Sequence, residues 1–105
     1  MNERWVDAGG LDDAAEGEAR EAVVEGRSLA IYRTEGRVYA SDNLCTHGEA
    51  RLCEGWLEGT EIECPLHQGR FDLNTGKALC DPLTTDIRVY PVHVERDRVL
   101  VQMQA

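Results

Sequence analysis

The chain of 105 residues has few basic residues and few histidines. Eleven Lys and Arg stand against 20 Asp and Glu, which gives a formal net charge of -9. This balance opposes binding to nucleic acid, because contacts to the phosphate backbone need cationic side chains. The charge is consistent either with solubility alone or with electrostatic steering towards a basic patch on a protein partner. Composition does not choose between these two interpretations.

Long apolar runs and a basic leader segment are also missing. No stretch approaches the ~20 apolar residues that a helix needs to cross a bilayer. The first residues, MNERWVDAGGLDD, lack the basic segment and apolar stretch of a secretory signal peptide, so we expect a cytoplasmic protein. Thiols stay reduced in that compartment, and the four cysteines therefore indicate metal binding more than disulfide bonds.

The sequence contains no long amphipathic helix and no internal repeat, and short strand patterns dominate it. Residues 28–41 hold two β-prone runs around Thr34-Glu35-Gly36, which predicts a hairpin. Residues 86–103 predict a second hairpin that turns at Glu95-Arg96-Asp97. Pro91 interrupts this region and predicts a bulge or an edge position, because proline cannot donate a ladder hydrogen bond.

Two weaker signals complete the predicted fold. Residues 18–26 fit a strand that ends at Gly26, and residues 11–16 allow one short helical turn. Together these patterns predict one all-β domain over residues 1–105, a small antiparallel β sandwich or barrel. The region between the two hairpins is rich in glycine and would form loops on this sheet scaffold.

The 23 residues from Cys45 to His67 hold three of the four cysteines and two of the three histidines. Two pairs stand out, Cys45-Thr46-His47 and Cys64-Pro65-Leu66-His67, and each combines one thiol with one imidazole. They could be incidental, or they could form a Cys2His2 zinc site. Zinc sites, however, usually take both cysteines from one knuckle and both histidines from another.

A Rieske 2Fe-2S centre explains the mixed pairs better, because there two histidines replace two cysteines on one iron. Each loop would give its cysteine to one iron and its histidine to the other. The predicted ligands of the cluster, and of its metal, are therefore Cys45, His47, Cys64 and His67. The free ring nitrogens of the two histidines would also form the tip that meets a partner.

The segment NLCTHGEARLCEGWLEGTEIECPLHQGRFDLNTGKALCDP resembles the Rieske-type ferredoxins of aromatic-ring-hydroxylating dioxygenase systems, above all the naphthalene-dioxygenase ferredoxin group. The resemblance implies a Rieske-type fold with an inserted cluster-binding subdomain at about residues 43–83. It also implies a single 2Fe-2S cluster and the role of an electron carrier, not an enzyme. The implied partners are a flavin-dependent NADH:ferredoxin reductase as donor and a terminal oxygenase as acceptor. A shuttle that must dissociate quickly is best monomeric.

The chain departs from the respiratory Rieske proteins at four positions. Ala50 and Leu66 stand where that branch has the two cysteines of a disulfide clamp. Gly69 and Phe71 stand where it has a serine and a tyrosine that bond the cluster and a ligand sulfur. Fewer hydrogen bonds to sulfur stabilise the reduced state less, which predicts a potential at the low end of the Rieske range, roughly -150 mV.

The resemblance also implies supporting roles near the cluster. Pro82 would cover one side of it, and backbone amides would bond its sulfurs. The expected amide donors are those of Thr46, Gly48, Leu66, Gln68 and Gly69.

For four remaining residues we expect structural roles and no part in electron transfer. Cys53 and Cys80 are expected to be small, largely buried thiols. Trp5 and Trp56 are expected to pack against the core and the cluster loops.

Two alternative functions stay open. One is the small Rieske-like subunit of an assimilatory nitrite reductase, and the other is a zinc-bound structural or interaction module. The terminal oxygenase itself is excluded, because its mononuclear iron needs two further histidines and a carboxylate. Only His93 remains outside the two pairs, and we expect it to be a partly exposed strand residue. The reductase is excluded as well, since no G-x-G-x-x-G fingerprint for a dinucleotide is present.

Overall fold

The computed structural model describes residues 4–46, 49–66, 69–80 and 85–103 of the chain. Helical structure in these ranges is limited to two 3-10 turns, η1 (Leu11–Asp13) and η2 (Leu52–Glu54), and strands form the rest of the framework. The strands are β1 (Trp5–Gly10), β2 (Glu18–Val24), β3 (Arg27–Thr34), β4 (Arg37–Asp42), β5 (Trp56–Glu58), β6 (Glu61–Glu63), β7 (Arg70–Asp72), β8 (Val89–Tyr90), β9 (Val92–Glu95) and β10 (Arg98–Gln102). The predicted all-β class is confirmed, and no helix in the described ranges is long and apolar enough to cross a membrane.

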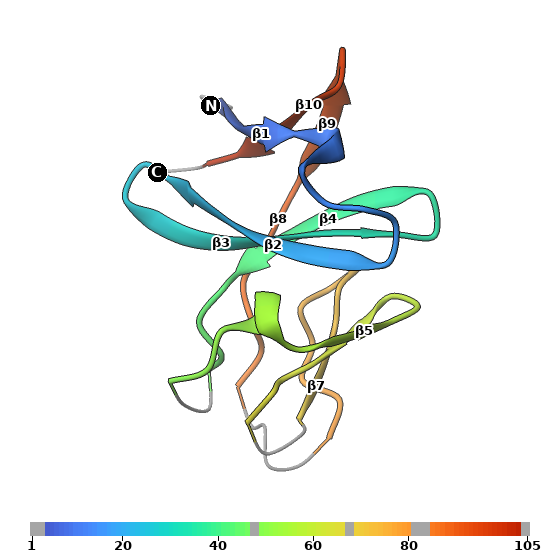
Figure 1. The fold of residues 1–105 in the computed structure, drawn as a ribbon. Coiled ribbons are helices and arrows are strands. Elements are labelled where there is room, and N and C mark those ends of the chain that lie inside the picture. The colour runs from blue at the N-terminus through green and yellow to red at the C-terminus, as the bar shows by residue number, and fades with distance from the viewer. Residues whose placement is uncertain (1–3, 47–48, 67–68, 81–84, 104–105) are drawn as a thin grey trace.

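The strands form three antiparallel sheets that follow one another along the molecule (Figure 1). The first has the order β1-β10-β9, the second the order β2-β3-β4-β8, and the third the order β5-β6-β7. In Figure 1 the second sheet lies in the middle, with the first sheet above it and the third below it. The middle sheet is therefore covered on both faces.

Both predicted hairpins are confirmed. β3 and β4 pair from Leu29 with Asp42 to Thr34 with Arg37, around a turn at Glu35 and Gly36. β9 and β10 pair around Arg96 and Asp97, and both turn residues have positive φ angles (51° and 65°). Each turn could be predicted from the sequence because its residues tolerate the left-handed backbone conformation that a tight hairpin needs.

The chain changes sheets at Pro91. β8, immediately before it, is an edge strand paired with β4, and β9, immediately after it, is an edge strand paired with β10. The prediction of an edge position is confirmed. The carbonyl oxygen of Pro91 accepts a 3.0 Å hydrogen bond from the backbone N–H of Gln102. The missing N–H of its ring falls between two edge strands, where proline is tolerated.

Two cores lie on opposite faces of the middle sheet, and β3 contributes to both. Leu29 and Ile31 pack into the core beneath the first sheet, whereas Ala30 and Tyr32 pack into the core above the third sheet. Alternate residues of a strand point to opposite faces, so a strand buried on both sides must be apolar throughout. The run Leu29–Tyr32 is apolar for this reason.

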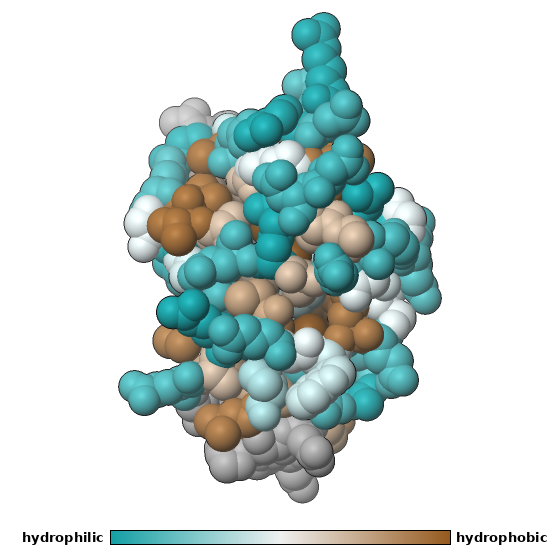
Figure 2. All heavy atoms as spheres, in the orientation of Figure 1, coloured by the Kyte–Doolittle hydropathy of each residue, from teal (hydrophilic) through white to brown (hydrophobic). Residues whose placement is uncertain are grey.

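The surface is mostly hydrophilic on the side that Figure 2 shows, in line with the acidic composition. Hydrophobic residues reach this surface in separate places, including the lower end of the view. Scattered apolar exposure of this kind is normal, and only contiguous patches point to an interface.

Candidate functional site

The two predicted cysteine ligands lie in the core between the middle sheet and the third sheet. Cys45 follows β4 by three residues, and Cys64 follows β6 directly. Both are buried, with 4% and 1% of their surface exposed. Phe71 and Ile62 belong to the same core and are fully buried. The sequence brings two thiols together in a dry, apolar environment.

Backbone hydrogen bonds shape the loop that carries Cys45. The N–H of Cys45 donates to the carbonyl of Ala50 at 2.8 Å, and Leu44 and Arg51 form an isolated antiparallel bridge beside it. The hydroxyl of Thr46 donates to the carbonyl of Thr85 at 2.8 Å. This contact ties the loop to the segment that leads into β8.

Asn43 anchors the same loop to two other parts of the chain. Its side-chain amide donates to the hydroxyl of Ser28 at 3.1 Å, and its side-chain oxygen accepts from the N–H of Cys53 at 2.9 Å. Its own N–H and carbonyl are bonded to Ser28 and Leu52. Asn43 is 1% exposed, and a buried polar side chain with this many partners holds its surroundings in one arrangement. Sequence analysis missed this residue, and its position two residues before Cys45 was the available signal.

The loop that carries Cys64 is closed in a similar way. The N–H of Cys64 donates to the carbonyl of Gly69 at 2.7 Å. The backbone N–H of Leu66 is placed to donate to the sulfur of Cys64, and its bond to a sulfur of the cluster stays a prediction. Gly55 lies against this loop, because a Cβ atom there would be 2.0 Å from the carbonyl oxygen of Glu63.

Cys45 and Cys64 are neighbours in this core, close enough for each thiol to affect the other. The pKa of the Cys64 thiol is raised to about 11, chiefly by burial and also by the neighbouring Cys45, while the Leu66 N–H opposes both effects. Only a thiolate binds metal, so a cation must displace these protons to bind here. Two buried thiols in one core supply soft sulfur donors, and these residues therefore fit the cysteine side of an iron–sulfur cluster.

The predicted histidine ligands, His47 and His67, lie outside the described residues, as do Gly48, Gln68 and Pro82. The structure thus brings together the two cysteines of the predicted set and does not test the two histidines. Within the described ranges, no three His, Cys, Asp or Glu residues gather closely enough to hold a metal ion.

Ala50 and Phe71, two of the positions that differ from the respiratory Rieske proteins, are apolar and buried. Ala50 is buried at 9% exposure, and Phe71 is fully buried in the core beside Cys64. A phenyl ring has no hydroxyl to donate to a sulfur. Leu66 is partly exposed on the second loop.

Three expectations about the remaining residues need correction or refinement. Cys80 is exposed and Cys53 only half-buried, so the prediction of two largely buried thiols is wrong for Cys80. Trp5 and Trp56, which are expected to pack against the core and the cluster loops, are 40% and 61% exposed, and neither belongs to the two core clusters. His93 is an exposed residue of β9, as expected, and its ring meets the edge of Trp5 at 6.1 Å between centroids.

Comparison with known proteins identifies the family. Residues 4–91 match the Rieske [2Fe-2S] domain. The ferredoxin component of the naphthalene 1,2-dioxygenase/salicylate 5-hydroxylase systems of a Ralstonia species is 58% identical over 104 residues, which cover 99% of this chain and 100% of that protein. A ferredoxin solved in complex with the oxygenase of carbazole 1,9a-dioxygenase superposes with a TM-score of 0.86 at 37% identity, over 96% of this chain and 94% of that one.

One of the alternative functions has a structural relative as well. A putative NADH-dependent nitrite reductase small subunit from Mycobacterium tuberculosis superposes with a TM-score of 0.89, over 100% of this chain and 99% of that one. Its sequence identity is only 24%, so this likeness shows the shared fold alone. Fold, buried thiols and sequence identity together lead to one conclusion: the chain belongs to the Rieske [2Fe-2S] domain family, as an electron-carrying ferredoxin component of the aromatic-ring dioxygenase type.

Proposed function

We propose that this ferredoxin carries one electron on a single Rieske 2Fe-2S cluster held by Cys45, His47, Cys64 and His67. The observation that supports the assignment is that Cys45 and Cys64, each at the base of one loop, are buried in the same core cluster. When bound, such a cluster accepts and releases single electrons at a potential set by its ligands and their hydrogen bonds.

The residues around the thiols would tune that potential. Leu66 N–H is the one described donor to the sulfur of Cys64, and the buried Phe71 adds none. Each hydrogen bond to sulfur offsets negative charge on the reduced cluster, so a sparse set keeps the potential low. The expected value is roughly -150 mV, at the low end of the Rieske range.

The proposed electron donor is a flavin-dependent NADH:ferredoxin reductase, and the proposed acceptor is a terminal oxygenase. The acceptor is supported by the relative that was solved in complex with the oxygenase of carbazole 1,9a-dioxygenase. We further propose that residues 1–105 act as one domain whose residues 43–83 form the cluster-binding subdomain. A monomer in the cytoplasm suits a carrier that must leave each partner quickly.

The ligand assignment is tested with two histidine variants of the purified ferredoxin. His67→Ala removes a proposed ligand, and we expect it to lose iron, the visible absorption and the rhombic EPR signal of the dithionite-reduced protein. His93→Ala is the matched control, because His93 is the third histidine and lies exposed on β9, and it should keep all three properties. An unchanged spectrum and normal reductase-dependent turnover in His67→Ala would refute the assignment. A colourless wild-type protein with stoichiometric zinc would refute the electron-carrier function.

A further inference from the structure

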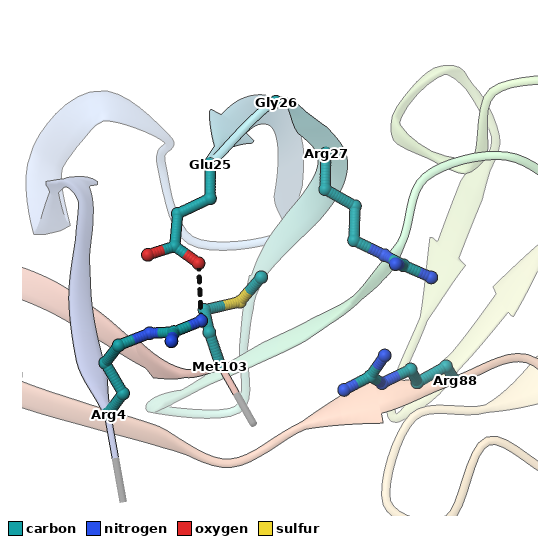
Figure 3. Close-up of a pocket in the computed structure, with 6 residues that line it drawn as sticks. All are labelled: Arg4, Glu25, Gly26, Arg27, Arg88 and Met103. Carbon is teal, nitrogen blue, oxygen red and sulfur yellow. Dashed lines mark hydrogen bonds and ion pairs between the residues drawn. The ribbon is translucent and has the colours of Figure 1, made fainter. Parts of the chain in front are cut away.

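An arginine-lined groove runs along the middle sheet towards the loop of Cys45. Its upper part is an open pocket of about 370 Å³ (Figure 3). The residues that line this pocket are Arg4, Glu25, Gly26, Arg27, Arg88 and Met103. Its lower part is a hollow of about 550 Å³ that shares Gly26 and Arg27 and continues past Leu44 to Cys45 and Thr46. One continuous surface therefore connects the arginines to a proposed ligand of the cluster.

Two of the arginines point into the same space. Figure 3 shows the guanidinium groups of Arg27 and Arg88 facing each other across the pocket. Arg27 is held from behind by Asp42, with Nε 3.1 Å from its carboxylate. Arg88 is held over the ring of Tyr90, with 4.7 Å between the guanidinium carbon and the ring centroid. Tyr90 in turn donates its hydroxyl to Asp42, at 2.5 Å, so one network fixes both arginines.

Two fixed guanidinium groups that face each other are prepared for an oxyanion. Arg27 already shares its charge with Asp42, so a carboxylate placed between the two groups would chiefly satisfy Arg88 and bridge it to Arg27 through charge-assisted hydrogen bonds. Arg4 is already paired with Glu25 at 2.7 Å on the opposite wall. In the described part of the chain, Arg88 has no carboxylate within 4 Å. The Arg27–Arg88 pair is the binding element of this groove.

The net charge of the chain selects the source of the carboxylate. At a formal charge of -9, the protein repels free anions at long range. A carboxylate carried by a docked protein meets the same repulsion, but the other contacts of that interface hold it at the pocket at a high effective concentration, which offsets it. The lower hollow ends at Cys45 and Thr46, so the protein that delivers the carboxylate is one that binds beside the cluster. Of the two proposed partners, the oxygenase is the one with which a ferredoxin 37% identical to this chain was solved in complex.

We propose that the groove binds an acidic segment of the terminal oxygenase, with a carboxylate between Arg27 and Arg88 and an apolar side chain against Leu44. Leu44 is 58% exposed and supplies the apolar contact midway along the groove. This inference rests on the proposed function, since it assigns a docking element to one of its two partners. It gives the acidic ferredoxin a basic contact of its own, at the side of the cluster loops.

The test uses the complete, cluster-containing ferredoxin with the oxygenase and the reductase of a naphthalene dioxygenase system. Stopped-flow mixing measures two second-order rate constants, one for oxidation of the reduced ferredoxin by the oxygenase and one for its reduction by the reductase. We expect Arg88→Gln to slow the oxygenase step about threefold, and the double variant Arg27→Glu/Arg88→Glu to slow it about tenfold or more. Arg37→Gln is the matched control, an exposed arginine at the other end of β4, and should leave both steps unchanged.

The readouts separate this inference from the proposed function. A wild-type ferredoxin that passes no electron to the oxygenase would refute the function itself. If wild type transfers electrons and the variants match it, the docking assignment alone fails. Slowing of the reductase step, alone or to the same degree, would overturn the choice of the oxygenase. Saturable binding of inorganic phosphate that the variants lose, with an unchanged oxygenase step, would identify a free-anion site instead. The visible spectrum of each variant shows that its cluster is intact.

Discussion

Asn43 illustrates how one side chain can fix the geometry of a whole site. Its amide group joins Ser28 of β3 to the N–H of Cys53 in η2, and it does so two residues before a proposed ligand. Neither partner is a metal ligand. The position of Cys45 nevertheless depends on this bridge, because the loop has little secondary structure of its own.

Asn43→Ala should therefore destabilise the protein and loosen the cluster. Removing the amide leaves the N–H of Cys53 without its partner and opens a small cavity, which together cost about 2 to 3 kcal/mol. Urea unfolding followed by circular dichroism measures the loss, and absorbance at visible wavelengths follows release of the cluster. Asn74→Ala, at an exposed turn, is the control and should change neither. Equal stability of the two variants would contradict the anchoring role.

Residue types also show where sequence reasoning fails at this scale. Cysteine and tryptophan side chains are buried on average, but Cys80, Trp5 and Trp56 are exposed in this structure. Whether a side chain is covered depends on which distant segment packs over it, and a single sequence does not contain that information. The spacing of Cys45 and Cys64 to histidine carries a chemical meaning, and their shared burial agrees with the prediction that both are ligands.

The middle sheet is the element that organises the molecule. Its strand β3 serves two cores, so the sheet acts as a common wall between the first sheet and the cluster-bearing region. The two hairpins were predictable because each depends on a local turn. The pairing of β8 with β4, and of β10 with β1, was not, because these partners lie far apart in sequence.

Two glycines in turns provide a test of how the cluster-bearing region closes on the middle sheet. Gly36 and Gly76 have positive φ angles of 72° and 82°. A Cβ atom at Gly36 would meet nothing within 4 Å, whereas one at Gly76 would lie 2.1 Å from the carbonyl oxygen of Ile87. The two sites share the backbone strain and differ in the space available.

Gly36→Ala should cost about 1 kcal/mol of unfolding free energy, from the left-handed conformation alone. Gly76→Ala adds a backbone clash and should cost about 3 kcal/mol in total. Urea titration of both variants measures the difference. Equal losses would show that the turn at Gly76 moves away from Ile87 at no cost, contrary to the close approach described above.

The two hydrophobic cores of the molecule differ in whether they contain proposed cluster ligands. One core lies between the first and middle sheets and contains no proposed ligand, whereas the other contains both Cys45 and Cys64. A metal bound to the second core adds its binding free energy to that part of the fold. The two halves should therefore respond differently when the cluster is removed.

Hydrogen exchange read by mass spectrometry can measure this response. In the apo protein, made by Cys64→Ser, amides of residues 49–66 and 69–80 should exchange at least tenfold faster than in the holo protein. Amides of β1 and β10 should keep their protection, because they pair with each other away from the site. Uniform acceleration in all three sheets would show a single cooperative unit and contradict the division.

The first and last described residues meet. The N–H of Met103 donates to the carbonyl of Arg4 at 2.8 Å, and both lie at the end of the molecule opposite the third sheet (Figure 1). A domain whose first and last described residues lie side by side can be inserted into a surface loop of another protein without distorting the domain or the loop. It can also be circularly permuted through a short linker. In both designs the cluster loops would project outwards, free to meet a redox partner, as an electron-transfer cassette.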